Sequence, residues 1–184
     1  MTKDKKPYVC PAEFAYSLDN VFRKLVHNPR KILKPYIIEG MTVLDLGCGP
    51  GYFTTELARL VGNSGKVIAA DLQQKMLDMM TKKIAVNGFE HRVKPHLCSA
   101  DRIGISIKVD FVLAFWMVHE VPDQESLFSE LKSLLNPEGK ILIAEPKFHV
   151  NSLLFNQMIT RLESRGLSVI ENPKVTFSRS VLVS

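Results

Sequence analysis

The sequence lacks the segments that direct a protein out of the cell or into a membrane. Its first seven residues carry four charged side chains and no apolar stretch of the kind that a signal peptide needs. The longest apolar run, Phe111–Val118, has eight residues, whereas a membrane-spanning helix needs about 20. We therefore expect a cytoplasmic protein with no membrane segment.

Cysteine is also scarce. The 184 residues include only Cys10, Cys48 and Cys98, an odd number with no C-x-x-C spacing, which fits free thiols in a reducing compartment. A chain of this length can bury enough surface to fold without a disulfide or a structural metal. The composition excludes a disulfide scaffold, and we assign the chain no metal site.

Internal repeats and Pro/Gly/Ser-rich linkers are absent, so one globular domain is expected. The net charge of +5 is unevenly distributed. Residues 1–40 hold eight Lys/Arg and four Asp/Glu, whereas residues 41–184 hold sixteen and fifteen. This basic N-terminal segment is either a solvated helix face or a surface that meets an anionic partner such as a nucleic acid.

Short apolar runs that are typical of buried strands alternate with amphipathic helical patterns. Strands are expected at residues 42–46, 66–70, 92–97, 110–115 and 140–144, with helices at 52–61, 73–86, 124–135 and 152–165. Such alternation predicts a parallel sheet with right-handed crossovers. Residues 167–170 and 175–183 predict an antiparallel hairpin at one sheet edge, and residues 11–38 look helical, with breaks near Pro29 and Pro35. The expected fold class is α/β: a single doubly wound, Rossmann-like domain with a mostly parallel seven-stranded sheet and helices on both faces.

The most informative segment runs from Val43 to Phe53, where a buried strand leads through Gly47, Gly49 and Gly51 into a helix. Glycines in such a turn permit positive φ and let a ligand approach the backbone, and ligands of open parallel sheets bind in this crevice. The third glycine follows the first by four residues, not by the five of a dinucleotide fingerprint, and no P-loop lysine follows. Asp45 before the turn would repel a pyrophosphate but attract an ammonium group.

On these residues the chain resembles the class I S-adenosylmethionine-dependent methyltransferases, in particular the type 11 and type 25 domains that act on small molecules. The resemblance covers about residues 35–184 and is most specific over Val43–Gly51, the family's acidic-x-Gly-x-Gly-x-Gly pattern. It implies that Asp45 holds the methionine amino group and that the three glycines pack against the methionine and ribose. S-adenosylmethionine would then be the cofactor and S-adenosylhomocysteine the product.

Acidic side chains after the next two strands complete the expected cofactor site. Asp71 can accept from both ribose hydroxyls, or else it caps the following helix. The resemblance implies that Leu72 lies against the adenine and that Asp101 holds the adenine amino group, although Asp101 could also be an exposed loop acid. Arg102 either covers the adenine or faces water. The same resemblance places Cys48, Met76, Ala100 and Phe115 around the cofactor.

The acceptor side is expected in the loop from Phe115 to Asp123. Trp116, the only tryptophan, either belongs to the core or forms an apolar wall near the acceptor. His119 is the best candidate for a general base, because an imidazole titrates near neutral pH; alternatively it is structural. Glu145, at the end of the 140–144 strand, is a second candidate catalytic residue. It and Glu120 could help to orient an acceptor, or both could be ordinary helix caps or salt-bridge acids.

The resemblance also implies that residues 1–38 form a helical lid, with Tyr16 contacting the cofactor, over a methyltransferase domain at 39–184. The leading hypothesis is methyl transfer by in-line displacement to a small-molecule acceptor. The alternatives are an RNA methyltransferase, a thiol or metalloid methyltransferase, and a cofactor-binding module without catalysis. The Asn/Asp-Pro-Pro-Tyr/Phe run of base-amino methylating enzymes is missing, which makes nucleic acid an unlikely partner. A monomer and a homodimer both remain open.

Overall fold

The computed structural model describes residues 26–184. Most of the predicted lid, including Tyr16 and Cys10, lies outside the described residues. The predicted division between a lid and a methyltransferase domain at residue 38 therefore stays a prediction.

The described chain forms a seven-stranded sheet in the order β3-β2-β1-β4-β5-β7-β6. The strands β1 to β5 pair in parallel, and β7 pairs antiparallel with both β5 and β6. The predicted fold class, with its antiparallel C-terminal hairpin, is confirmed. The strands are β1 Thr42–Leu46, β2 Lys66–Asp71, β3 Val93–Leu97, β4 Val109–Phe115, β5 Leu135–Pro146, β6 Val169–Glu171 and β7 Ser178–Val183.

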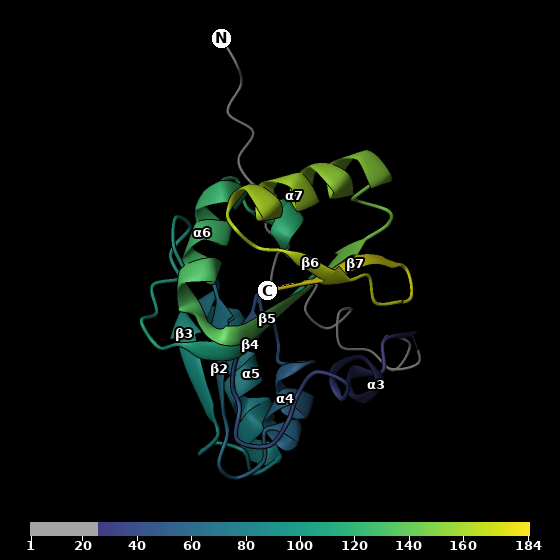
Figure 1. The fold of residues 1–184 in the computed structure, drawn as a ribbon. Coiled ribbons are helices and arrows are strands. Elements are labelled where there is room, and N and C mark those ends of the chain that lie inside the picture. Colours follow the sequence, from purple (N-terminus) through teal and green to yellow (C-terminus); the bar gives the residue numbers. More distant parts are fainter. Residues whose placement is uncertain (1–25) are drawn as a thin grey trace.

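Helices cover both faces of this sheet (Figure 1). On one face α3, α4 and α5 bury Leu33, Leu57 and Met80 against residues such as Val43 of β1. On the other, α6 and α7 bury a second cluster that includes Leu44. Alternate residues of each buried strand belong to the two clusters in turn, as expected of a sheet covered on both sides. The helices are α3 Pro29–Leu33, α4 Thr54–Leu60, α5 Gln74–Val86, the 3₁₀ turn η2 Val118–Glu120, α6 Gln124–Leu134 and α7 Ser152–Ser164.

Several predicted boundaries were wrong by a few residues. Helix α4 begins at Thr54 because residues 47–53 are occupied by the glycine turn. Strand β5 already begins at Leu135, across the predicted break at 136–139, because Leu135 pairs with Val109 of β4. The predicted breaks near Pro29 and Pro35 are confirmed, because residues 27–28 separate the helical residue Val26 from α3, and α3 ends at Leu33. Pro29 is the first residue of α3 after the N-cap Asn28, a position where a proline needs no amide hydrogen bond.

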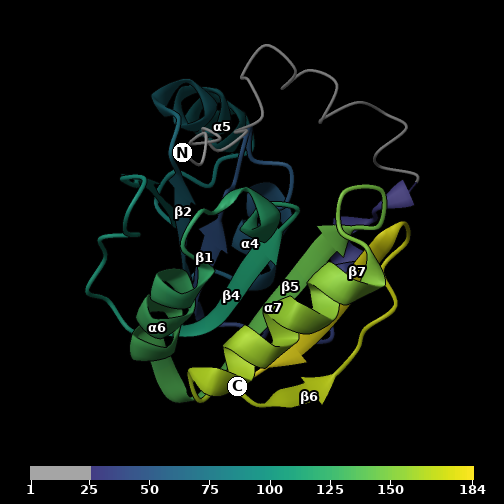
Figure 2. The ribbon, with the colours of Figure 1, turned by 90° about the horizontal axis from the view of Figure 1, so that it is seen from above.

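The carboxyl ends of β1, β2, β3, β4 and β5 lie at the same edge of the sheet because these strands are parallel. The turns that follow them gather there, and Figure 2 shows the segments after β4 and β5 side by side at that edge. This edge is the position at which open α/β sheets bind ligands. Among the described helices, none has both the length and the apolar character needed to cross a membrane.

Candidate active site

A cavity of about 1120 Å³ opens at the carboxyl edge of the sheet. Nearly all of the predicted site residues that the structure describes line it. They are Asp45, Gly47, Cys48, Gly49, Asp71, Leu72, Met76, Ala100, Asp101, Arg102, Phe115 and His119. Gly51 and Glu145 belong to the described residues but do not line the cavity.

The three glycines of the turn after β1 all have positive φ but have different tasks. A Cβ on Gly47 would lie 2.9 Å from Met117 Cβ, so this position needs a close approach of two backbone segments. A Cβ on Gly49 would meet no atom within 4 Å, which leaves its backbone open to a ligand. A Cβ on Gly51 would lie 2.7 Å from Met80 Cγ of α5. A glycine at this position therefore allows α5 to pack against the turn, and the contact of Gly51 with the cofactor stays a prediction.

Asp45 is a buried acid that faces this turn from within β1. Its side chain is almost fully enclosed, and Oδ2 accepts a hydrogen bond of 2.6 Å from Thr54 Oγ1 at the start of α4. Asp45 also lines the cavity, and a carboxylate can accept several hydrogen bonds. The position suits a cationic ammonium group, as the sequence predicts.

Asp71 bonds to the start of the following helix and to the glycine turn at the same time. Oδ1 accepts from the Gln73 amide at 2.9 Å, as a cap would, and Oδ2 accepts from the Gly49 amide at 2.9 Å. Burial raises the pKa of this carboxyl, although the hydrogen bonds from the amides of Gln73 and Gly49 oppose the shift. The carboxylate thus fixes the glycine turn while lining the cavity, and its contact with a ribose stays a prediction.

The segment after β3 forms the far end of the cavity. Asp101 is solvated there, and a hydrogen bond from the Ser99 side chain lowers its pKa. Glu130 of α6 supports the segment, because its two carboxylate oxygens accept from the amides of Ile103 and Gly104, each at 2.8 Å. The sequence analysis missed Glu130, since a carboxylate in the middle of an amphipathic helix gives no local sign of what it will contact.

Aromatic side chains form one wall of the cavity. Trp116 has an unusual positive φ of 61°, which turns its indole so that Nε1 donates to Ser178 Oγ at 2.9 Å. Its ring stacks on Phe115 and meets the edge of Phe148, with centroids 5.5 Å and 5.4 Å apart. Strained backbone of this kind is concentrated at functional sites. The predicted apolar wall is therefore present, and Phe148, which the sequence analysis missed, extends it.

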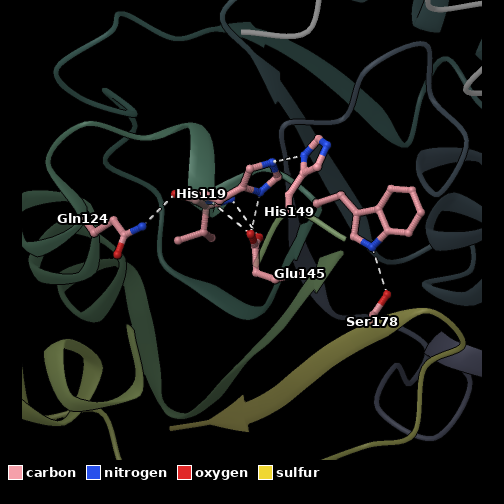
Figure 3. Close-up of polar contacts among 7 residues, drawn as sticks. His119, Gln124, Glu145, His149 and Ser178 are labelled. Carbon is pink, nitrogen blue, oxygen red and sulfur yellow. Dashed lines mark hydrogen bonds and ion pairs between the residues drawn. The ribbon is translucent and has the colours of Figure 1, made fainter. Parts of the chain in front are cut away.

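The best candidate base is held by a buried acid (Figure 3). His119 Nδ1 lies 2.5 Å from Glu145 Oε2, and Glu145 also accepts from the amides of Val118 and His119, at 3.0 Å and 3.2 Å. His119 Nε2 points toward Nδ1 of His149, 3.4 Å away. Because Glu145 is fully buried with its oxygens directed at η2, it orients His119 and does not reach an acceptor. The expectation that Glu145 itself orients the acceptor was wrong.

Glu145 also affects the pKa of His119. Burial lowers the pKa of the imidazole, but the hydrogen bond that His119 donates to Glu145 and the charges of Glu145 and Glu120 together raise it above its ordinary value. Because Glu145 holds Nδ1, Nε2 is the ring nitrogen on the side of His149, whose Nδ1 lies 3.4 Å away. His149 was missed by the sequence analysis, although its place directly after a strand at the carboxyl edge is a signal that could have found it.

The charge of the cavity is opposite to that of the whole chain. Its described lining includes six carboxylates, Asp45, Asp71, Asp101, Glu120, Asp123 and Glu130, but only one permanent cation, Arg102. The protein as a whole has a net charge of +5. The cavity therefore favours cationic or neutral ligands over anionic ones.

The two thiols near this cavity are poor nucleophiles. Burial is the main cause that raises the pKa of Cys98 to about 12, and it raises the pKa of Cys48 further still. Asp71 reinforces both shifts through its negative charge. Neither cysteine has the electropositive surroundings that activate a thiol.

Fold and site together define an α/β protein with a cavity at the carboxyl edge of its sheet, where the strand order reverses between β1 and β4. Residues 37–174 match the family described as "Methyltransferase domain". The chain belongs to this methyltransferase family, which confirms the resemblance seen in the sequence.

Named relatives agree with this assignment. Demethylmenaquinone methyltransferase of Lactobacillus johnsonii is 34% identical over 121 residues, covering 62% of this chain and 48% of that protein. The ubiquinone/menaquinone biosynthesis C-methyltransferase UbiE of Escherichia coli is 31% identical over 107 residues, covering 58% and 43%. The chain thus spans about half the length of these curated relatives.

Solved structures support the fold. A SAM-dependent methyltransferase from Aquifex aeolicus, 26% identical, superposes with a TM-score of 0.85 over 95% of this chain and 98% of that one. Aeropyrum pernix fibrillarin, solved with S-adenosyl-L-methionine, is 13% identical, has a TM-score of 0.68 over 88% and 74%, and supports the fold alone.

Proposed function

We propose that this protein is an S-adenosylmethionine-dependent methyltransferase that acts on a small, uncharged or cationic acceptor. The observation that carries the proposal is the cavity in which the open backbone of Gly49, the buried Asp45 and the carboxylate of Asp71 meet beside His119. S-adenosylmethionine, when bound, supplies a methyl group that is already activated on a sulfonium. Its positive charge suits the acidic lining.

The residues of the chain supply positioning and one proton acceptor. In-line displacement depends mainly on holding the nucleophile close to the methyl carbon and aligned with it. The aromatic wall of Phe115, Trp116 and Phe148 offers a flat apolar surface for an acceptor. His119 Nε2 would accept the proton of a hydroxyl or thiol nucleophile, while Glu145 keeps the other ring nitrogen protonated.

The names of the relatives suggest a first acceptor to test. By name, one curated relative is a demethylmenaquinone methyltransferase and the other is a C-methyltransferase of ubiquinone/menaquinone biosynthesis. A demethylmenaquinone-type ring would fit an aromatic wall next to a base. The acidic lining argues against RNA, whose phosphates would meet six carboxylates. The predicted cytoplasmic location and the choice between monomer and homodimer remain part of the proposal.

Calorimetry and methyl transfer test the proposal separately. S-adenosylhomocysteine should bind with a measurable heat, whereas the Gly49→Arg variant should show none. Labelled S-adenosylmethionine should transfer its methyl group to an acceptor from a panel of quinols, phenols, thiols and amines or from a cell extract. Binding without any labelled product would support the cofactor-binding module instead.

Variants of His119 test its role as base. His119→Ala should lower kcat by about 10²-fold or more while leaving the affinity for S-adenosylhomocysteine unchanged. His91→Ala is the matched control, since His91 is exposed before β3 at the opposite end of the sheet. Equal rates for His119→Ala and the unchanged protein would remove His119 from the mechanism.

A further inference from the structure

A second cavity, of about 550 Å³, lies between the start of β7 and the amino-terminal end of α7. One side is formed by residues 172–176, which connect β6 to β7, and another by Lys147 directly after β5. It shares no lining residue with the larger cavity. The lining residues used below are Lys147, Asn172, Lys174, Ser178 and Arg179.

Cations from three separate segments meet in this cavity. Lys147 follows β5, Lys174 lies in the β6–β7 connection and Arg179 lies in β7, and the described lining contains no carboxylate. The acids nearest to it in the sheet are engaged elsewhere. Glu145 bonds to η2, and Glu171 accepts a hydrogen bond from the Tyr36 hydroxyl at 2.9 Å.

Arg179 lies opposite an acidic residue in the sheet but does not form an ion pair with it. It lies directly opposite Glu145 in the β5–β7 register, so the two side chains share a face of the sheet, yet Glu145 bonds to His119. Arg179 Nη2 donates to Ser152 Oγ at 2.8 Å, and Nη1 is buried with no hydrogen bond to any described residue. A partly buried cation without an anionic partner favours the binding of an anion.

We infer that this cavity is a binding site for a compact oxyanion, the phosphate or carboxylate group of a small molecule. Lys147, Lys174 and Arg179 provide the charge, and the Asn172 amide provides a further polar group. The site is distinct from the acidic cavity in sign of charge and in residues, so it does not depend on the proposed methyl transfer.

The only tryptophan of the chain reports on this site. Ser178 lines the oxyanion cavity, and its hydroxyl accepts the hydrogen bond from Trp116 Nε1. A ligand next to Ser178 should therefore change the fluorescence of Trp116.

The experiment titrates the full chain with sodium phosphate and, separately, with sodium succinate, against sodium chloride at equal ionic strength. We expect a saturable change in fluorescence with phosphate, succinate or both, and only a small, linear change with chloride. Saturation by one anion alone identifies which oxyanion group the site takes. Amide chemical-shift changes in NMR spectra should cluster at Ser178, Arg179 and Lys147.

Two double variants make the test specific. Lys147→Ala with Lys174→Ala removes two of the three cations and should weaken binding at least about tenfold. Lys82→Ala with Lys132→Ala removes two exposed lysines elsewhere and should leave binding unchanged. A linear response to every anion, or equal affinity in the two double variants, would overturn the inference. Calorimetry with S-adenosylhomocysteine on the same samples shows independently whether the methyltransferase site is intact.

Discussion

Replacing Glu145 by glutamine removes the negative charge that holds His119 while the size and shape of the side chain stay nearly the same. Glutamine keeps one acceptor oxygen but gains an amide group that would face the backbone N–H of Val118 or of His119, both of which are donors. The histidine also loses its carboxylate partner in a fully buried position. Removing one partner of a buried pair costs about 3 kcal/mol, which corresponds to a fall in Tm of roughly 6–12 °C for a chain of this size.

The effect should depend on pH with a definite sign. Because Glu145 holds the folded-state pKa of His119 above its unfolded value, the charged histidine stabilises the native protein fully below about pH 6.5. This contribution disappears as the pH rises through the folded-state pKa. Without Glu145, only the charge of Glu120 opposes burial, which lowers the pKa of His119. The difference in the free energy of unfolding between the unchanged protein and Glu145→Gln should therefore be larger at pH 6 than at pH 9.

Urea denaturation at both pH values measures this difference, and NMR of the ring nitrogens follows the titration of His119. Glu125→Gln is the control, because Glu125 pairs with Arg165 at the surface, where such pairs contribute at most about 1 kcal/mol. A loss below 1 kcal/mol for Glu145→Gln at pH 6, or an identical loss at both pH values, would refute the reasoning.

Two other predictions concern the glycine turn and the thiols. Gly51→Ala should lower stability by about 2 kcal/mol or more in thermal denaturation, because its Cβ would collide with Met80 in addition to the strain of positive φ. Gly49→Ala, with no atom within reach, should lose about 1 kcal/mol but bind S-adenosylhomocysteine more weakly; a reversed order would contradict the assigned roles. Cys48 and Cys98 should react with a thiol reagent at pH 8 far more slowly than in urea, and rapid labelling of the native thiols would contradict their raised pKa values.

The periodicity of the sequence was sufficient to predict the seven strands and their layers. Buried strands such as residues 42–46 are nearly continuous apolar runs, and the helices between them carry apolar residues at helical spacing, so both patterns are local. The boundary errors arose where tertiary contacts determine the residue at which a strand or helix begins. The pairing of Leu135 with Val109, for example, extends β5 through an Asn-Pro-Glu-Gly segment that reads as a turn.

The residues of the candidate site were predictable where a polar or titratable side chain lies at the end of a strand or directly after it. Asp45, Asp71 and His119 were found in this way, because residues at the carboxyl ends of parallel strands gather at one edge. Other contacts of the site join segments that are distant in the sequence. Trp116 bonds to Ser178, 62 positions away, and Glu130 reaches Ile103 from a neighbouring helix. No local pattern encodes such contacts, which depend on the packing of the whole sheet.

The two cavities of the sheet have linings of opposite charge, acidic in the larger cavity and basic in the smaller one. Arg179 and Glu145 face each other across β5 and β7, but their charges are directed to different cavities: Glu145 toward His119, and Arg179 toward Ser152 and the oxyanion site. If the two formed an ion pair, His119 would lose the partner that raises its pKa and the second cavity would lose part of its positive charge. Keeping them apart therefore serves both sites. Trp116 lines the acidic cavity and donates a hydrogen bond to Ser178, which lines the oxyanion cavity, so Trp116 is the residue through which one site would affect the other.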